Sequence, residues 1–212
     1  MFINKKAFST INLPSSTSIL DIGCGTGQTA AFLNHKYGCL VTGIDKHPIM
    51  IEKAKNRLNK TPSVKIVKGD AECLSFKDNA FDFILAESVI SFTNVSKTLQ
   101  ELSRVLKQGG QMIAIEMSST HSLSDKFQKK IENLYGIHKV LSQKEWEEKL
   151  IHAGFHSISI KNVSPELKET FITDMQPSEN LNIKWYDMWD THNSLVNQSE
   201  TFLRYQVLKC EK

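Results

Sequence analysis

The stretch ILDIGCGTG at residues 19–27 decides the fold. An apolar run that contains a single acid, Asp21, passes into three glycines at every second position, and residues 28–37 then have the pattern of a helix. Glycines allow a tight turn and a close approach of a ligand to the main chain, and the first amides of the helix point toward that ligand. Residues 19–27 therefore predict a strand, a ligand-binding loop and the start of a helix.

The spacing of the glycines argues against two common nucleotide-binding loops. A dinucleotide fingerprint reads G-x-G-x-x-G, and a Walker loop needs Gly-Lys followed by Ser or Thr. This loop reads G-x-G-x-G and contains neither lysine nor arginine. Asp21 would also repel a pyrophosphate, so a ligand that carries positive charge fits better.

Strands and helices alternate along the first half of the chain. Apolar runs predict strands at 18–22, 39–45, 64–67, 81–86 and 112–115. Helices are expected at 28–37, from Pro48 onward, and at 95–106, where Gly109-Gly110 stops the helix. This rhythm predicts a parallel sheet with helices on both faces.

The second half has a different order. Helices are expected at 125–135 and 142–153, the latter with a capping box formed by Ser142 and Glu145. Alternating segments at 156–163 and 202–209 predict two more strands.

Two further acids follow the next predicted strands. Asp45 ends the run 39–45, eighteen positions after the last glycine of the loop, and Asp70 follows the run 64–67. In doubly wound folds an acid after the second strand accepts hydrogen bonds from ribose hydroxyls. Since ligands bind at the carboxyl ends of such strands, Asp21, Asp45 and Asp70 are expected to line one crevice.

Composition limits the classes of function. The 212 residues carry 26 basic and 23 acidic side chains, a net charge of +3, which argues against a nucleic-acid partner. No apolar run approaches the ~20 residues of a membrane span, and the first residues lack a signal peptide pattern. The four cysteines form no C-x-x-C pair, which argues against a metal site and for a reduced, cytoplasmic protein.

With its glycine loop, Asp45 and the sequence Gly69-Asp70-Ala71, the chain resembles the class I S-adenosylmethionine-dependent methyltransferases. It is most similar to the small-molecule branch that includes the ubiquinone and menaquinone biosynthesis methyltransferases. The resemblance covers residues 17–116 well, whereas 117–212 match only in the coarse order of strands and helices.

The expected fold is an α/β, Rossmann-like, doubly wound sheet of seven mostly parallel strands, with helices on both faces and an antiparallel C-terminal strand. We expect one methyltransferase domain over residues 1–212. Its parts are a helix within 1–16, a cofactor-binding half at 17–116, and a C-terminal half at 117–212 with a lid insertion at 164–200.

The resemblance implies S-adenosylmethionine as the cofactor. The glycine loop and Glu87 would hold its methionine end, Asp45 its ribose, and the segment at Asp70 its adenine. The implied cofactor-binding residues are Asp21, Gly23, Cys24, Gly25, Asp45, Lys46, Asp70, Ala71, Glu72 and Glu87. One departure is His47, which stands where the family usually has Ser or Asn as a helix cap and is a weaker cap.

The acceptor is expected to be a small molecule. Residues 86–89 lack the Pro-Pro signature of amino-group methylation on nucleic-acid bases, and no cysteine lies beside a proline. A base is needed only if the acceptor must lose a proton, and the candidates are Glu116, His121 and Tyr135.

The aromatic residues of the insertion would suit a flat or apolar acceptor. The protein is expected to be a monomer or a homodimer. The alternatives are a catalytically silent S-adenosylmethionine-binding regulator and a nicotinamide-dependent oxidoreductase.

Overall fold

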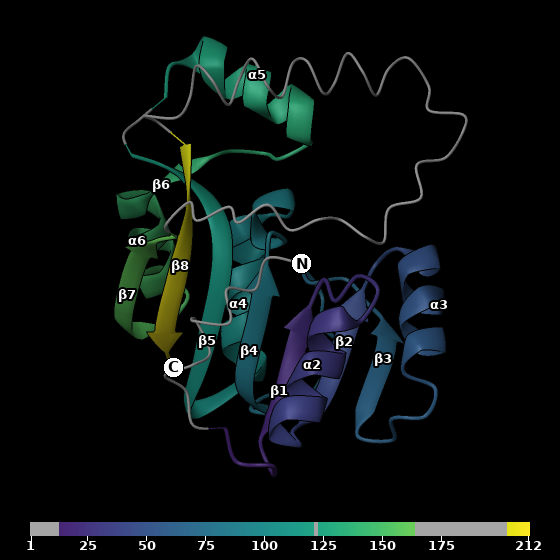
Figure 1. Cartoon of the computed structure of the whole chain (residues 1–212). Coiled ribbons are helices and arrows are strands. Elements are labelled where there is room, and N and C mark those ends of the chain that lie inside the picture. Colours follow the sequence, from purple (N-terminus) through teal and green to yellow (C-terminus); the bar gives the residue numbers. More distant parts are fainter. Residues whose placement is uncertain (1–12, 121–122, 164–202) are drawn as a thin grey trace, which may run out of the picture.

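A computed structural model describes residues 13–120, 123–163 and 203–212 (Figure 1). In chain order the elements of the first half are β1 (Ser18–Ile22), α2 (Gln28–Tyr37), β2 (Leu40–Asp45), α3 (Pro48–Arg57), β3 (Val64–Lys68), β4 (Phe81–Glu87), the 3-10 helix η1 (Ile90–Phe92) and α4 (Val95–Val105). They are followed by β5 (Leu106–Ser119), α5 (Asp125–Tyr135), β6 (Leu141–Ser142), α6 (Gln143–His152), β7 (His156–Asn162) and β8 (Leu203–Glu211).

One sheet forms the centre of the described structure, in the strand order β3-β2-β1-β4-β5-β8-β7. Strands β1 to β5 are parallel to their neighbours, whereas β8 runs antiparallel to both β5 and β7. The predicted α/β sheet with an antiparallel C-terminal strand is therefore confirmed. The two-residue strand β6, which pairs with the end of β5, was not predicted.

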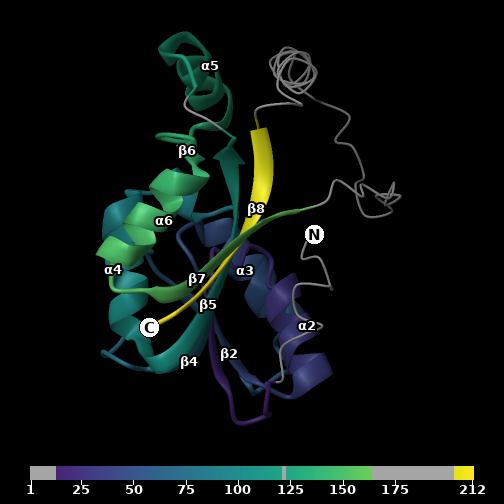
Figure 2. The same cartoon turned by 90° about the vertical axis from the view of Figure 1, so that its left-hand side faces the viewer.

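Helices cover both faces of the sheet (Figure 2). Side chains of α4 and α6 bury one face in a core that includes Leu99, Leu102 and Trp146. Side chains of α2 and α3 bury the other face in a core that includes Leu33 and Ala54. Strands covered on both faces read as continuous apolar runs, which is why 81–86 was recognisable in the sequence.

The helix α4 ends at Val105, within one residue of its predicted end, but Gly109-Gly110 does not stop it. It ends where the carbonyls of Arg104 and Val105 accept hydrogen bonds from the amides of Asn79 and Ala80. The backbone then becomes extended at once, so both glycines lie within β5.

Strand β5 is also longer than the run 112–115 suggested. It continues to Ser119 because β8 pairs with it from Gln111 onward to that residue. Glu116 therefore lies within the strand and not at its end.

The other expected elements form within a few residues of their predicted bounds, and Ser142 and Glu145 make the predicted capping box. His47 precedes α3 without a side-chain cap. Three of the expected features lie outside the described residues. They are residues 1–12 of the expected N-terminal helix, the expected lid at 164–200, and His121. Within the described ranges, no helix is both long and apolar enough to span a bilayer.

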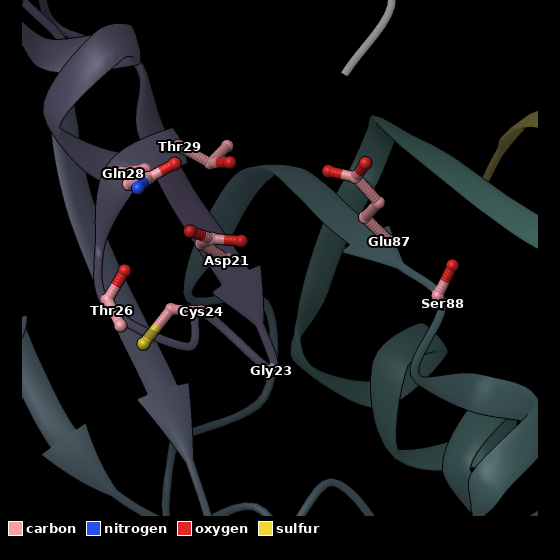
Figure 3. A pocket seen from close by; sticks show the side chains of 8 residues that line it. All are labelled: Asp21, Gly23, Cys24, Thr26, Gln28, Thr29, Glu87 and Ser88. Carbon is pink, nitrogen blue, oxygen red and sulfur yellow. The ribbon is translucent and has the colours of Figure 1, made fainter. Parts of the chain in front are cut away.

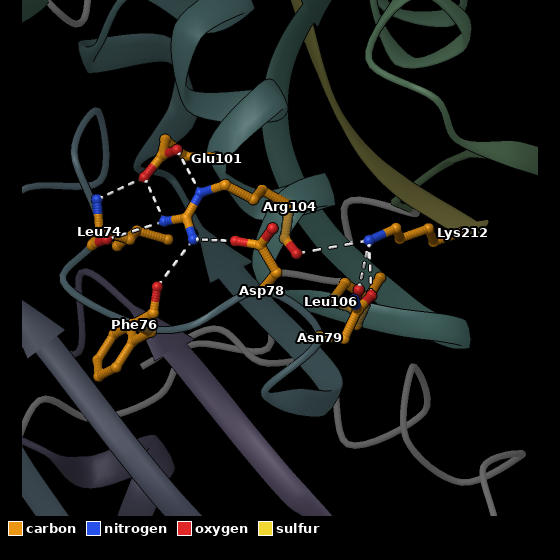
Figure 4. A network of polar contacts seen from close by, with 8 residues as sticks. All are labelled: Leu74, Phe76, Asp78, Asn79, Glu101, Arg104, Leu106 and Lys212. Carbon is orange, nitrogen blue, oxygen red and sulfur yellow. Dashed lines mark hydrogen bonds and ion pairs between the residues drawn. The ribbon is translucent and has the colours of Figure 1, made fainter.

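A network around Arg104 fastens residues 74–78 to α4 (Figure 4). The guanidinium donates to both carboxylate oxygens of Glu101, to Asp78, and to the carbonyls of Leu74 and Phe76, at 2.7–2.9 Å. Glu101 also accepts the amide of Leu74 at 2.7 Å. This segment follows the third predicted acid, so the network holds one end of the crevice in place.

We expect the Arg104→Ala substitution to lower the free energy of unfolding by about 2–3 kcal/mol, because Glu101 and two carbonyls lose a charged donor. For a chain of this size that corresponds to a melting temperature lower by roughly 4–12 °C. Thermal denaturation followed by circular dichroism measures it. The control is Lys144→Ala, whose ion pair with Glu148 is highly exposed and should contribute almost nothing. Equal melting temperatures for the two variants would contradict the role assigned to Arg104.

Candidate functional site

The glycine loop links β1 to α2 in a left-handed conformation. Gly23, Gly25 and Gly27 have φ angles of 65°, 52° and 75°, which side-chain-bearing residues rarely adopt. The amide of Cys24 donates to the carbonyl of Ile44 at 2.8 Å and so fastens the loop to β2.

The glycines have different surroundings. A Cβ atom on Gly23 would lie 2.2 Å from a methyl group of Val89, whereas a Cβ on Gly25 would meet nothing within 4 Å. Gly23 is thus required by packing against the segment after β4, and Gly25 borders open space.

Two adjoining cavities lie at the carboxyl ends of the parallel strands. The first, of about 260 Å³, is lined by Asp21, Gly23, Cys24, Thr26, Gln28, Thr29, Glu87 and Ser88 (Figure 3). The second, of about 280 Å³, is lined by Gly23, Ile44, Asp45, Lys46, Gly69, Asp70, Ala71, Glu87, Ser88, Val89, Phe92 and Thr93. Because Gly23, Glu87 and Ser88 belong to both, the cavities form one crevice across β1, β2, β3 and β4.

Asp21 is the most unusual group in this crevice. Its side chain is only 4% exposed, and Oδ2 has no hydrogen-bond partner among the described residues. Burial, followed by the negative charges of Glu87 and Asp45, raises the pKa of Asp21 to about 8. A ligand that offers a donor or a positive charge would complete this site.

Asp45 shapes the glycine loop from the end of β2. Its Oδ2 accepts the amide of Gly25 at 3.0 Å, and its Oδ1 accepts the amide of His47 at 2.8 Å. The carboxylate lines the second cavity, as expected, and it is oriented before any ligand binds.

The residues of the segment after β3 have different roles. Asp70 and Ala71 line the second cavity, but Glu72 does not. The carboxylate of Glu72 accepts the amide of Asn94 at 3.0 Å and lies 3.9 Å from Lys97, so it caps the start of α4 instead. Of the ten residues proposed for the cofactor, eight line one or both cavities, and Gly25 and Glu72 line neither.

Several lining residues were not predicted. Thr26, Gln28 and Thr29 lie at the start of α2 and line the first cavity. The sequence could have indicated them, because they are polar residues in or directly after a glycine loop. No local sequence pattern indicates that Ser88 and the lining residues after it belong to the site. Ser88 has a φ of 54°, a strained conformation for a residue other than glycine and one that is typical of functional sites.

The two candidate bases within the described residues, Glu116 and Tyr135, line neither cavity. Glu116 is fully buried, and its carboxylate accepts hydrogen bonds from the segment after β4. Tyr135 is the last residue of α5, and burial followed by the nearby Tyr205 raises the pKa of its phenol.

Asp21 should make stability depend on pH. Its folded-state pKa of about 8 lies above its ordinary value of 3.8, so its stabilising contribution is complete below pH 3.8 and is lost as the pH rises to 8. Asp21→Asn removes this titration. In the ligand-free protein, the melting temperature of the wild type relative to Asp21→Asn should therefore fall steadily between about pH 5 and 8.5. The exposed Asp125→Asn is the control, and parallel curves for wild type and Asp21→Asn would refute the assignment.

The two glycines should respond differently to alanine. A left-handed alanine costs about 1–2 kcal/mol at either position. Gly23→Ala must also displace Val89, so its free energy of unfolding should be clearly lower than that of Gly25→Ala, as urea denaturation can measure. Equal losses would mean that Val89 does not pack against the loop as described.

Comparisons with known proteins agree with this geometry. Residues 20–114 match the family model described as "Methyltransferase domain". The chain is 38% identical over 191 residues to the uncharacterized methyltransferase YodH of Bacillus subtilis, covering 89% of this chain and 82% of that protein. It is 34% identical over 117 residues to the demethylmenaquinone methyltransferase of Staphylococcus aureus, covering 54% of this chain and 48% of that one.

A solved structure shows the same fold. Phosphoethanolamine N-methyltransferase 2 of Haemonchus contortus, in complex with S-adenosyl-L-methionine, superposes with a TM-score of 0.79 at 21% identity, over 98% of this chain and 51% of that one. The sheet order, the glycine loop with its acids, and the extended match to YodH lead to one conclusion: the chain belongs to the class I S-adenosylmethionine-dependent methyltransferases.

Proposed function

We propose that the crevice binds S-adenosylmethionine through the residues that line it and presents its methyl group to a small-molecule acceptor. The observation that carries this proposal is the buried carboxyl of Asp21, whose Oδ2 has no partner in the described part of the chain, beside a loop of left-handed glycines. A cationic ligand with many hydrogen-bonding groups fits such a site, and a nicotinamide dinucleotide with its pyrophosphate does not.

The first cavity suits the methionine end of the cofactor. Asp21 and Glu87 supply negative charge for an ammonium group and a sulfonium, and the arrival of positive charge would favour ionised Asp21. The amides at the start of α2 and the side chains of Gln28 and Thr29 are available to a carboxylate.

The second cavity suits the nucleoside. Asp45 is oriented by two amides and has remaining lone pairs for ribose hydroxyls, with Lys46 beside it. Asp70 and Ala71 lie where an adenine would be held, and Val89 and Phe92 supply apolar surface for a ring.

When bound, S-adenosylmethionine supplies an electrophilic methyl group on a good leaving group. The residues of the chain therefore need to do little chemistry beyond binding and alignment. Holding the two reactants in line is worth ~7–11 kcal/mol in well-oriented systems. Glu87 and Ser88, which border both cavities, are best placed to define the position of the reacting end.

For the acceptor we propose a class, a small molecule, and not a particular compound. The segment after β4 reads Glu87-Ser88-Val89 and contains no proline, which argues for a small molecule over a nucleic-acid base. The Staphylococcus aureus relative is named for demethylmenaquinone, but its match covers about half of either chain. The acceptor is therefore best found by transferring a labelled methyl group to a panel of phenolic, quinone and amine acceptors.

We also propose that the protein acts in the cytoplasm, as a monomer or a homodimer. All four cysteines are free, and three of them are buried, as suits a reducing compartment.

Replacing Asp45 with alanine should weaken binding of S-adenosylhomocysteine at least about tenfold, because the sugar loses its charged acceptor. Isothermal titration calorimetry measures the dissociation constant. Asp125→Ala, a substitution on α5, is the control and should leave affinity unchanged. If the wild type binds no S-adenosylhomocysteine below millimolar concentrations, the proposed function is wrong. If Asp45→Ala binds as tightly as the wild type, the site is misplaced.

A further inference from the structure

Glu116 places a carboxylate in the interior of the protein, where the proposed chemistry does not use it. Its side chain is 0% exposed. Oε1 accepts the amides of Val89 and Ile90 at 3.0 and 2.8 Å, and Oε2 accepts the amide and the hydroxyl of Ser91 at 3.2 and 2.7 Å. None of these four donors carries a charge.

Three backbone amides, which can only donate, and one hydroxyl converge on the two oxygens. A carboxyl oxygen accepts from each amide, whereas an NH₂ group in place of either oxygen would face at least one amide donor. Burial raises the pKa of Glu116, and the four hydrogen bonds oppose that rise. The desolvation of a charge is costly, and it is tolerated where every lone pair is engaged.

The donors belong to the segment that forms the crevice wall, residues 88–93, here called the β4 loop. The preceding amide, that of Ser88, donates to the carbonyl of Ile115 at 2.8 Å. Four consecutive amides of the β4 loop, at 88–91, are thus bound to two adjacent residues of β5.

The β4 loop carries much of the crevice. Ser88 lines both cavities, and Val89, Phe92 and Thr93 line the second. Val89 also packs against Gly23, so the position of the β4 loop sets the distance between this wall and the glycine loop. Ser88 is held in a strained conformation, which persists only where the surroundings impose it.

We propose that Glu116 is a positioning residue for methyl transfer: it fixes the β4 loop against β5, and through that loop it sets the shape of the cofactor crevice. It does not act as a general base. This inference rests on the proposed function of the crevice, but it concerns a residue that lines neither cavity.

The test compares Glu116→Gln with the wild type. Glutamine keeps the size of the side chain but places an NH₂ group against backbone donors. Amide hydrogen exchange followed by NMR should show reduced protection at Val89, Ile90 and Ser91. Calorimetry should show weaker binding of S-adenosylhomocysteine, about tenfold weaker if the loop holds its competent conformation a tenth of the time.

The matched control is Glu145→Gln. Glu145 also accepts a backbone amide and a serine hydroxyl, in the capping box of α6, away from the crevice. It should lose stability without losing affinity for S-adenosylhomocysteine, which separates positioning from a general loss of folding.

A second variant covers the case in which Glu116→Gln does not fold. Ser91→Ala removes one donor and leaves the carboxylate, so it should lower protection and affinity in the same direction by a smaller factor. Wild-type affinity in a folded Glu116→Gln, or in Ser91→Ala where Glu116→Gln does not fold, would overturn the inference while leaving the proposed function intact. An absence of binding in the wild type would overturn the proposed function, and with it the role of Glu116.

Discussion

Asp21 carries a carboxyl group to the end of the central strand β1, where it is buried and one of its oxygens has no partner within residues 13–120, 123–163 and 203–212. The position is possible because β1 is flanked by β2 and β4, both parallel to it, so that three strand ends converge there. The same convergence brings Glu87 and Asp45 close enough to raise the pKa of Asp21. The proposed cofactor site follows from this placement, since a cationic ligand would supply the missing partner.

The crevice is built from two kinds of support. Main-chain geometry provides the first, through left-handed glycines and through amides oriented by Asp45. Side chains that lie outside the crevice provide the second: Glu116 holds the wall after β4, and Arg104 with Glu101 holds the segment after Asp70. The second kind uses charged groups with several hydrogen bonds each, which makes these loops part of the rigid fold rather than independent turns.

Family membership and the residues of the site address different questions. The match to YodH and the methyltransferase model establish the kind of reaction. The contacts of the cofactor remain a proposal about individual residues, and Glu72 illustrates the difference. It stands next to Asp70 and Ala71 in the motif, yet its carboxylate caps α4 through Asn94.

The sequence by itself determined the strand and helix order, the glycine loop and the acids at the strand ends, because hydrophobic period and turn chemistry are local properties. Eight of the ten residues that it proposed for the cofactor line the crevice, since each lies at or just after the end of a recognisable strand. Only the tertiary structure decided the surroundings of Glu116, the direction of Glu72 and the contact between Val89 and Gly23. These depend on the register of β4 against β5 and on packing between segments far apart in the chain, and no local pattern encodes such distances.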